Sequence, residues 1–244
     1  MRMTDYPPAL ILLVGVVLLP LLKGRVRWTV AFALPVIALA DAWAVIQAGT
    51  DSFVPFIGMQ LNPVHVHAAT PVFATVFAIM VLGGLLYALN QKRESELPAA
   101  CLYAGGALGV LFCGDLVSMF VFWEVMTLGS TVLIWAGRQN DSYGAGMRYF
   151  GMHAAGGVML LMGIIIVISQ RIHAGDPNPL EFRHFDAMVD SWSTLSWQSG
   201  GMWLILLGML VNAGAPPFSS WIPDAYPQGS PSGTVMLSAF TTKT

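Results

Sequence analysis

Residues 116–136 read LVSMFVFWEVMTLGSTVLIWA, an apolar run with one ionisable side chain, Glu124, near its middle. A helix of about 20 mostly apolar residues is long enough to cross the hydrocarbon core of a bilayer. The run therefore predicts a membrane-spanning helix that carries a carboxyl group at membrane depth. A charge in that position is costly and usually functional, so Glu124 is the first candidate site residue.

The composition of the whole chain supports a membrane protein. Hydrophobic residues make up 56% of the 244 residues and charged residues 10%, whereas a soluble domain carries about 25% charged residues. The formal net charge of -2 gives no reason to expect nucleic acid as a partner. Cys101 and Cys113 have no CxxC partner, so we predict two apolar core residues and no metal or redox framework. With no nicotinamide, flavin or cluster motif, no cofactor is predicted.

Eight apolar segments predict an all-α, polytopic transmembrane bundle. The first six cover about 8–22, 28–48, 71–89, 97–113, 116–136 and 149–169, and the others begin near 201 and 233. The eighth is still apolar where the sequence stops at Thr244. Because a helix that ends inside a bilayer leaves carbonyl groups unsatisfied, we expect either that the native sequence continues or that a second chain supplies the missing helices.

The seventh segment carries the signature of a broken helix. Asn212, Gly214 and Pro216-Pro217 stand together within it. Proline removes a backbone donor and clashes with the preceding turn, and irregular backbone at membrane depth is tolerated where it is buried in protein or lines water. Transporters build ion sites from such breaks; a proline kink or an early helix end is the alternative.

The polar loops predict how the chain is oriented in the membrane and where one helix lies on the membrane surface. Seven of the Lys and Arg residues flank the odd-numbered loops and three the opposite side, which puts the N-terminus on the non-cytoplasmic side of the cell membrane. The two groups are Lys23, Arg25, Arg27, Lys92, Arg93, Arg138 and Arg148, against Arg2, Arg171 and Arg183. In the longest polar stretch, residues 171–198, the apolar side chains predict a short amphipathic helix on the membrane surface.

Five further polar residues accompany Glu124 in or beside the apolar segments. They are Asp41, Asp115, Arg148, His153 and Lys243. Glu124 is interpreted as a proton relay, the alternative being a protonated, hydrogen-bonded carboxyl group. Lys243 either needs an acidic partner or snorkels to the interface, and His153 is equally a relay or a core histidine. Asp41 and Arg148 are read chiefly as interfacial or packing residues, and Asp115 as a helix cap.

Two runs of sequence resemble a known family. FVFWEVMTLGSTVLIW, residues 120–135, is similar to the fifth-helix signature of the proton-pumping subunits of respiratory complex I and of Mrp-type cation/proton antiporters. APPFSSWIPDAYPQGSPSGTVMLSAFTTKT, residues 215–244, resembles the broken seventh helix, loop and eighth helix of the same family. The likeness is greatest to the D-type subunit of Mrp antiporters and covers about residues 97–244, which we treat as an antiporter-like module after a three-helix region over residues 1–96.

The resemblance implies a mechanism and partners. In that family the glutamate matched by Glu124 and the lysine matched by Lys243 carry protons to mid-membrane, together with waters and histidines. The fold contains inverted repeats of five helices, of which this chain would hold the first. The subunits work in a hetero-oligomeric membrane complex that either exchanges sodium for protons or is driven by quinone chemistry. The chain would thus be a transporter subunit without a redox site of its own.

One residue departs from the family pattern. The helix-seven lysine that usually pairs with the helix-five glutamate corresponds to Asn212, which cannot hold a charge, and Arg148 is the candidate replacement partner. An antiporter subunit of the Mrp type is the leading hypothesis, and a proton-pumping subunit of a complex I-like NADH, quinone or ferredoxin oxidoreductase is the alternative. A non-conducting structural subunit is the third, favoured by the missing lysine.

Overall fold

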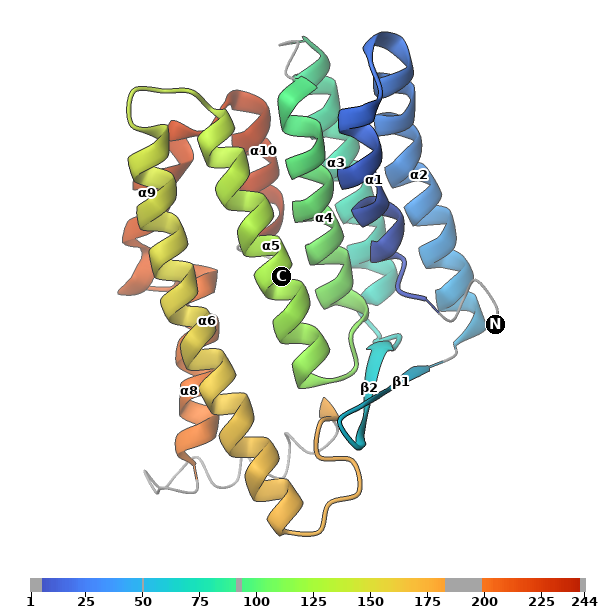
Figure 1. Ribbon diagram of the computed structural model, residues 1–244, viewed down its shortest axis with the longest axis vertical. Helices are drawn as coiled ribbons and strands as arrows, with labels where there is room; N and C mark the ends of the chain where they lie inside the picture. Colours follow the sequence, from blue (N-terminus) through green and yellow to red (C-terminus); the bar gives the residue numbers. More distant parts are fainter. Residues whose placement is uncertain (1–5, 50, 91–93, 183–198, 242–244) are drawn as a thin grey trace.

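The computed structural model describes residues 6–49, 51–90, 94–182 and 199–241 and shows an upright helical bundle with a small hairpin at one end (Figure 1). The N-terminal helices are α1 (Ala9–Leu21), α2 (Gly24–Ala48) and α3 (Thr70–Asn90). After a short 3-10 turn, η2 (Glu94–Glu96), come α4 (Leu97–Phe112), α5 (Leu116–Ala136) and α6 (Ser142–His173). The last part holds α8 (Gly200–Ala213), η5 (Phe218–Ser220), α9 (Trp221–Ala225), η6 (Tyr226–Gln228) and α10 (Pro231–Phe240).

The predicted polytopic, all-α architecture is confirmed. Within the described residues, six helical stretches are long and apolar enough to cross a membrane: 24–48, 70–90, 94–112, 116–136, 142–173 and 200–228. The count of eight spans stays a prediction, because α1 has 13 residues and the description of α10 ends at Phe240. Residues 183–198, which hold most of the predicted surface helix, lie outside the described residues.

Glycines let neighbouring helices approach closely in two places. A side chain at Gly106 of α4 would lie 2.6 Å from the backbone nitrogen of Met126 on α5. A side chain at Gly208 of α8 would lie 2.6 Å from the carbonyl oxygen of Gly156 on α6. Small residues at such contacts are how membrane helices pack without a hydrophobic driving force between them. The pairs α4–α5 and α6–α8 are therefore tightly fixed, which positions the polar groups that they carry.

The predicted break in the seventh segment is confirmed. Helix α8 stops at Ala213, and Gly214 takes the left-handed conformation with φ 68°. Pro216 and Pro217 follow, and the chain resumes as η5, α9 and η6 in short helical pieces. Ser230 then caps α10, its Oγ accepting a hydrogen bond from the backbone nitrogen of Gly233 at 2.9 Å.

A hairpin between α2 and α3 differs from the sequence-based expectation. Strands β1 (Ser52–Phe56) and β2 (Met59–Val64) form an antiparallel pair that the apolar pattern does not predict. Ile57 and Gly58 have φ values of 47° and 76°, as a tight two-residue hairpin turn requires. The hairpin is tied to the α4–α5 connection, where the backbone nitrogen of Gly114 donates to the carbonyl of Asn62 at 2.8 Å.

Helices α5 and α6 begin in different ways, and only α5 has a side-chain cap. Asp115 caps α5 as predicted, since its Oδ1 accepts hydrogen bonds from the backbone nitrogens of Val117 at 2.9 Å and Ser118 at 2.8 Å. Helix α6 begins at Ser142, seven residues before the predicted start, so its first two turns are built from the polar and glycine-rich sequence SYGAGMR.

Candidate functional site in the α5–α6–α8 region

The carboxyl group of Glu124 lies inside the bundle, where α5 faces α6. Its Oε1 atom is buried and has no hydrogen-bond partner among the described residues. The backbone of Gly157 stands against this oxygen, and a methyl group at position 157 would collide with it. Glu124 is thus half-buried, with one carboxyl oxygen buried and unpaired within the described part of the chain. An unpaired carboxyl group can exchange its proton with water or a neighbouring side chain.

The amide group of Asn212 is the second polar group of the site. Asn212 is fully buried on α8, and within the described residues neither its Oδ1 nor its Nδ2 has a hydrogen-bond partner. A side chain at Gly156 of α6 would lie 2.8 Å from Oδ1. Burial of an amide without a hydrogen bond costs free energy, so these atoms are suited to bind water or a transported ion.

The imidazole of His153 is buried on the same helix as these glycines. Its Nδ1 lies 3.1 Å from the carbonyl oxygen of Tyr149, and because a carbonyl only accepts, Nδ1 carries the hydrogen. Nε2 then carries no hydrogen and has no hydrogen-bond partner among the described residues, although the backbone of Asn212 lies close to the ring. The ring stacks on Tyr149 at 3.9 Å between centroids and meets the edge of Trp221 at 4.6 Å. The aromatic neighbours hold the imidazole in place and leave one nitrogen open to a proton.

Helix α6 brings the three groups together. Residues 153, 156 and 157 are spaced i, i+3 and i+4, so they share one side of the helix within a single turn. Glu124 Oε1 lies against Gly157 and Asn212 Oδ1 lies against Gly156. Both glycines are about one turn from His153. The structure thus assembles a carboxyl group, an imidazole and an amide from three helices at one level of the bundle. We call Glu124, His153 and Asn212 the central cluster.

Hydroxyl groups extend the central cluster back toward α5. Tyr149 donates from its hydroxyl to Ser130 Oγ at 2.8 Å. Ser130 in turn lies 2.9 Å from the carbonyl oxygens of Met126 and Thr127. All of these groups are buried in the described structure. Hydroxyl groups both donate and accept, so this row is able to relay hydrogen bonds between α6 and α5.

A second hydroxyl cluster joins α4 to α10. The Tyr103 hydroxyl accepts a hydrogen bond from the backbone nitrogen of Thr241 at 2.7 Å and also contacts Thr241 Oγ1. The Tyr226 hydroxyl donates to the carbonyl of Leu237 at 3.0 Å. Polar groups thus reach the end of the described part of α10. Lys243 lies outside the described residues, and its role stays a prediction.

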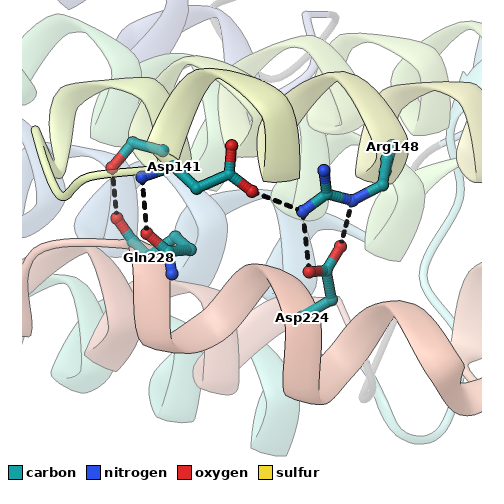
Figure 2. A network of polar contacts seen from close by, with 5 residues as sticks. Asp141, Arg148, Asp224 and Gln228 are labelled. Atoms are coloured by element: carbon teal, nitrogen blue, oxygen red, sulfur yellow. Dashed lines mark hydrogen bonds and ion pairs between the residues drawn. The ribbon is translucent and has the colours of Figure 1, made fainter.

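Arg148 has other partners than the glutamate that the sequence suggests. Its guanidinium binds Asp224 at 2.7 Å and 2.8 Å and Asp141 at 2.7 Å (Figure 2). All three side chains are more than a third exposed. The suggested Arg148–Glu124 pair is therefore wrong: the guanidinium is held at an exposed site by two carboxylates.

The same network connects α6 to the interrupted helix. Asp141 donates from its backbone nitrogen to Gln228 Oε1 at 3.3 Å, and Ser142 donates from its hydroxyl to the Gln228 carbonyl at 2.7 Å (Figure 2). With the Arg148–Asp224 pair, these bonds fasten the start of α6 to α9 and η6. Arg148 is thus a residue that positions the interrupted helix next to the central cluster.

The remaining candidate residues are Asp41 and the two cysteines. Asp41 is half-buried on α2, at the opposite edge of the bundle from α6 (Figure 1), so it does not join the central cluster. Cys101 and Cys113 are both buried and free, as predicted for core residues.

Several buried polar groups are not evident from the sequence. Glu96 is 2% exposed, although the sequence places it in a polar loop, and its Oε2 accepts a hydrogen bond from Ser232 Oγ at 2.6 Å. Tyr149 and Ser130 also do not stand out in the sequence. The sequence does offer one signal for the position of Glu96. Proline favours the first turn of a helix, so Pro98 indicates that a helix begins directly after Glu96.

An interrupted helix and polar groups buried at membrane depth are typical of membrane proteins that translocate ions. Residues 113–244 match the family described as NADH:quinone oxidoreductase/Mrp antiporter, TM, and the chain belongs to this family.

Curated relatives come from both branches of that family. NADH-quinone oxidoreductase subunit N of Salinispora arenicola is 28% identical over 272 residues, covering 97% of this chain and 52% of the relative. Na(+)/H(+) antiporter subunit A1 of Staphylococcus haemolyticus is 27% identical over 203 residues, covering 78% of this chain and 24% of the relative. The chain thus spans about half or less of the length of these relatives.

Solved structures share the fold over nearly the whole chain. The Mrp complex from Dietzia sp. DQ12-45-1b gives a TM-score of 0.78 at 23% identity, covering 100% of this chain and 47% of that one. Respiratory complex I from Thermus thermophilus gives 0.75 at 16% identity, covering 96% and 49%. At these identities the comparison establishes the helical fold.

Proposed function

We propose that the chain is a membrane subunit of a multisubunit cation/proton antiporter of the Mrp type and that protons move through its central cluster. The observation that carries the proposal is the position of two buried atoms without a hydrogen-bond partner among the described residues. Glu124 Oε1 lies against Gly157 of α6, and Nε2 belongs to His153, one turn earlier on the same helix. The antiporter relatives, at 27% identity, support the cation/proton assignment.

In this proposal each polar residue has a separate task. Glu124 binds and releases the proton, and His153 exchanges it through Nε2. Asn212 orients water beside them with its two unpaired amide atoms. Lys243 accepts the proton further along α10, as the family resemblance implies. Arg148 positions the interrupted helix through Asp224.

The organisation of the chain follows from the same proposal. Residues 97–244 form the proton-translocating module, supported by the family match over residues 113–244, and residues 1–96 form the accompanying three-helix region. The N-terminus lies on the non-cytoplasmic side of the cell membrane, by the distribution of Lys and Arg. Other membrane subunits complete the complex, and a second chain is one source of the remaining helices of the family fold.

A second candidate function is a proton-pumping subunit of a complex I-like oxidoreductase. It is favoured by the relative from Salinispora arenicola, whose match covers 97% of this chain against 78% for the antiporter subunits. The central cluster has the same task in both assignments. The subunits that copurify with the chain separate them: iron–sulfur or quinone-binding subunits indicate the oxidoreductase, and Mrp subunits the antiporter.

The function is tested by proton flux in membrane vesicles that hold the whole complex. A sodium gradient is imposed, and proton movement is recorded with wild-type chain, without the chain, and with Glu124→Gln. We expect flux with the wild type and a loss of roughly 100-fold with Glu124→Gln, since a positioned proton-transfer group contributes at least that factor. Unchanged flux in Glu124→Gln at every pH would contradict the role of Glu124. Flux driven only by quinone reduction would favour the second candidate.

A further inference from the structure

The imidazole of His153 lies between two backbone acceptors. The side chain is 1% exposed, and its Nδ1 lies 3.1 Å from the carbonyl oxygen of Tyr149 on the same helix. Because Nδ1 is turned toward α6, Nε2 is the nitrogen on the side of α8, where the backbone of Asn212 is the nearby acceptor. A neutral imidazole has one hydrogen to donate, whereas an imidazolium has two. The surroundings of the ring therefore match its charged form.

Pro216 is the reason that the carbonyl group of Asn212 is open. In a continuous helix this carbonyl accepts a hydrogen bond from the backbone nitrogen of residue 216, and proline has no hydrogen there to donate. The nitrogen of Ala215 reaches further back instead, to the carbonyl oxygen of Leu210 at 3.0 Å. Among the described residues, no backbone nitrogen donates to the carbonyl of Asn212. The break in the seventh segment thus leaves a buried acceptor beside the imidazole.

Three further features of the site favour a cation at His153. Helix α8 ends at Ala213, and the carbonyl end of a helix carries a partial negative charge. The ring of Tyr149 stacks on the imidazole at 3.9 Å between centroids, and an aromatic face attracts a cation. Glu124 Oε1 lies one turn along α6, against Gly157. Taking an imidazolium out of water costs free energy, and these features offset part of that cost.

The acidic group available to the imidazole is Glu124. Helix α8 has no titratable side chain, so it supplies no charge of its own. On α9, Asp224 is bound to Arg148 at an exposed site (Figure 2). The hydroxyl groups of Tyr149 and Tyr226 donate to Ser130 Oγ and to the carbonyl of Leu237. A charged imidazole at this level of the bundle therefore has one carboxyl group with which to pair.

We propose that Pro216 is a positioning residue, which keeps the Asn212 carbonyl open as an acceptor for the imidazolium form of His153. The proposal rests on the proton-translocating function. A proton that leaves the carboxyl group of Glu124 and binds Nε2 of His153 turns a neutral pair into a carboxylate and an imidazolium, so the net charge of the site is unchanged. Nε2 then donates to the carbonyl of Asn212, while Nδ1 still donates to that of Tyr149. Release of the proton from Nε2 returns the ring to its neutral form.

The first test gives residue 216 a backbone hydrogen. In Pro216→Ala the new N–H competes for the carbonyl of Asn212, so a higher proton concentration is needed to form the imidazolium. Proton flux is recorded against pH in vesicles that hold the whole complex. We expect the pH at which flux falls to half to move about one unit lower, since a hydrogen bond to a charged group is typically worth about that much.

Pro35→Ala is the matched control for this change. Pro35 lies inside α2, in the N-terminal region, and its replacement also returns an N–H to a membrane-spanning helix. Its flux profile should superimpose on that of the wild type. A profile of Pro216→Ala that also superimposes on the wild type would overturn the role of the open carbonyl.

The second test returns a cation to the site from α8. His153→Phe removes the imidazole and should lose roughly 100-fold in flux. Adding Asn212→Lys to this variant places a cation where the chain has an amide, and we expect at least about tenfold of the loss to be recovered. Adding Asn212→Met instead is the control, because methionine has a similar length and no charge. Recovery in both double variants, or in neither, would overturn the assignment of the cation to His153.

The outcomes separate this proposal from the function on which it rests. If Glu124→Gln loses flux but the two tests give the overturning results, the chain moves protons without an imidazolium at His153. If the double variants do not accumulate in the membrane, the profile of Pro216→Ala decides, and if Pro216→Ala does not accumulate, the recovery decides. If the wild type shows no flux under a sodium gradient or with quinone reduction, the proposed function itself fails, and the role of Pro216 fails with it.

Discussion

The α1–α3 region and the α5–α10 region of the bundle differ in how many polar side chains they bury. Among the described residues, Thr70 is the only buried polar side chain of α1, α2 and α3. The α5–α10 region buries Thr127, Ser130, His153, Asn212 and others, some without a hydrogen-bond partner in the described structure. Some of the buried hydroxyl groups of the second region bond carbonyl groups of their own helix. Among the groups without a partner are those to which the proposed function gives a task in proton transfer.

The largest effect is expected when the imidazole of His153 is replaced by an aromatic ring that has no nitrogen. This change tests whether the α5–α10 region differs from the α1–α3 region in transporting protons. In His153→Phe the ring can still stack on Tyr149 and meet Trp221, but Nε2 is lost. We expect proton flux per assembled complex to fall roughly 100-fold, because a proton-transfer group is gone, while the amount of protein in the membrane stays close to wild type. A flux within about threefold of wild type would show that His153 is a packing residue.

A smaller loss is expected from displacing the carboxyl group of Glu124. In Gly157→Ala the new methyl group meets Oε1, a side-chain end that is able to move. Flux should fall about tenfold, since misplacing a reacting group by about 1 Å is costly. Stability should hold or rise, because alanine favours a helix over glycine. Gly151→Ala is the control: apart from the adjoining backbone of α6, no described atom lies within 4 Å of its new methyl group. Equal flux in the two variants would argue that the position of the Glu124 carboxyl group against Gly157 does not matter for proton transfer.

The opposite pattern is expected in the N-terminal region. Leu19 of α1 is fully buried in the apolar core, and Leu19→Ala should lower the free energy of unfolding by roughly 2–5 kcal/mol through lost packing. Flux per assembled complex should not change. Thermal unfolding in detergent and vesicle flux measure the two quantities. A selective loss of flux without a loss of stability would contradict the division between the regions.

The smallest effect is expected at the exposed network of Figure 2. Arg148→Gln removes the contacts to Asp224 and Asp141. Exposed ion pairs stabilise little, and the bonds of Ser142 and Asp141 to Gln228 remain. We expect flux within about twofold of wild type. A loss as large as that of Glu124→Gln would mean that Arg148 acts in the proton route directly.

Much of the helical fold could be predicted from the sequence. The bounds of α5 agree with the prediction because Asp115 caps one end and the apolar run stops at Gly137. The hairpin was missed because Pro55 and Pro63 interrupt its short strands and its turn begins with isoleucine. The early start of α6 was missed because its first turns are stabilised by contacts with Gln228, 86 residues away.

The site was predictable to the extent that local sequence determines it. Glu124 stands out because it is the only charge in a long apolar run. The partners of Arg148 could not be read, because Asp224 is 76 residues away and comes close only after the interrupted helix turns back on α6. The contacts of Glu124 with Gly157 and of Asn212 with Gly156 likewise depend on how α5 and α8 pack on α6.

The most direct test of proton transfer through the central cluster removes one carboxyl group from each region. Glu124→Gln and Asp41→Asn each replace a carboxyl group within a membrane-spanning helix by its amide, and neither changes the size of the side chain. Proton flux under a sodium gradient is compared in vesicles with equal amounts of assembled complex. We predict that Glu124→Gln loses roughly 100-fold and that Asp41→Asn keeps the wild-type flux. Equal losses in the two variants, or a loss only in Asp41→Asn, would contradict the assignment of transport to the α5–α10 region.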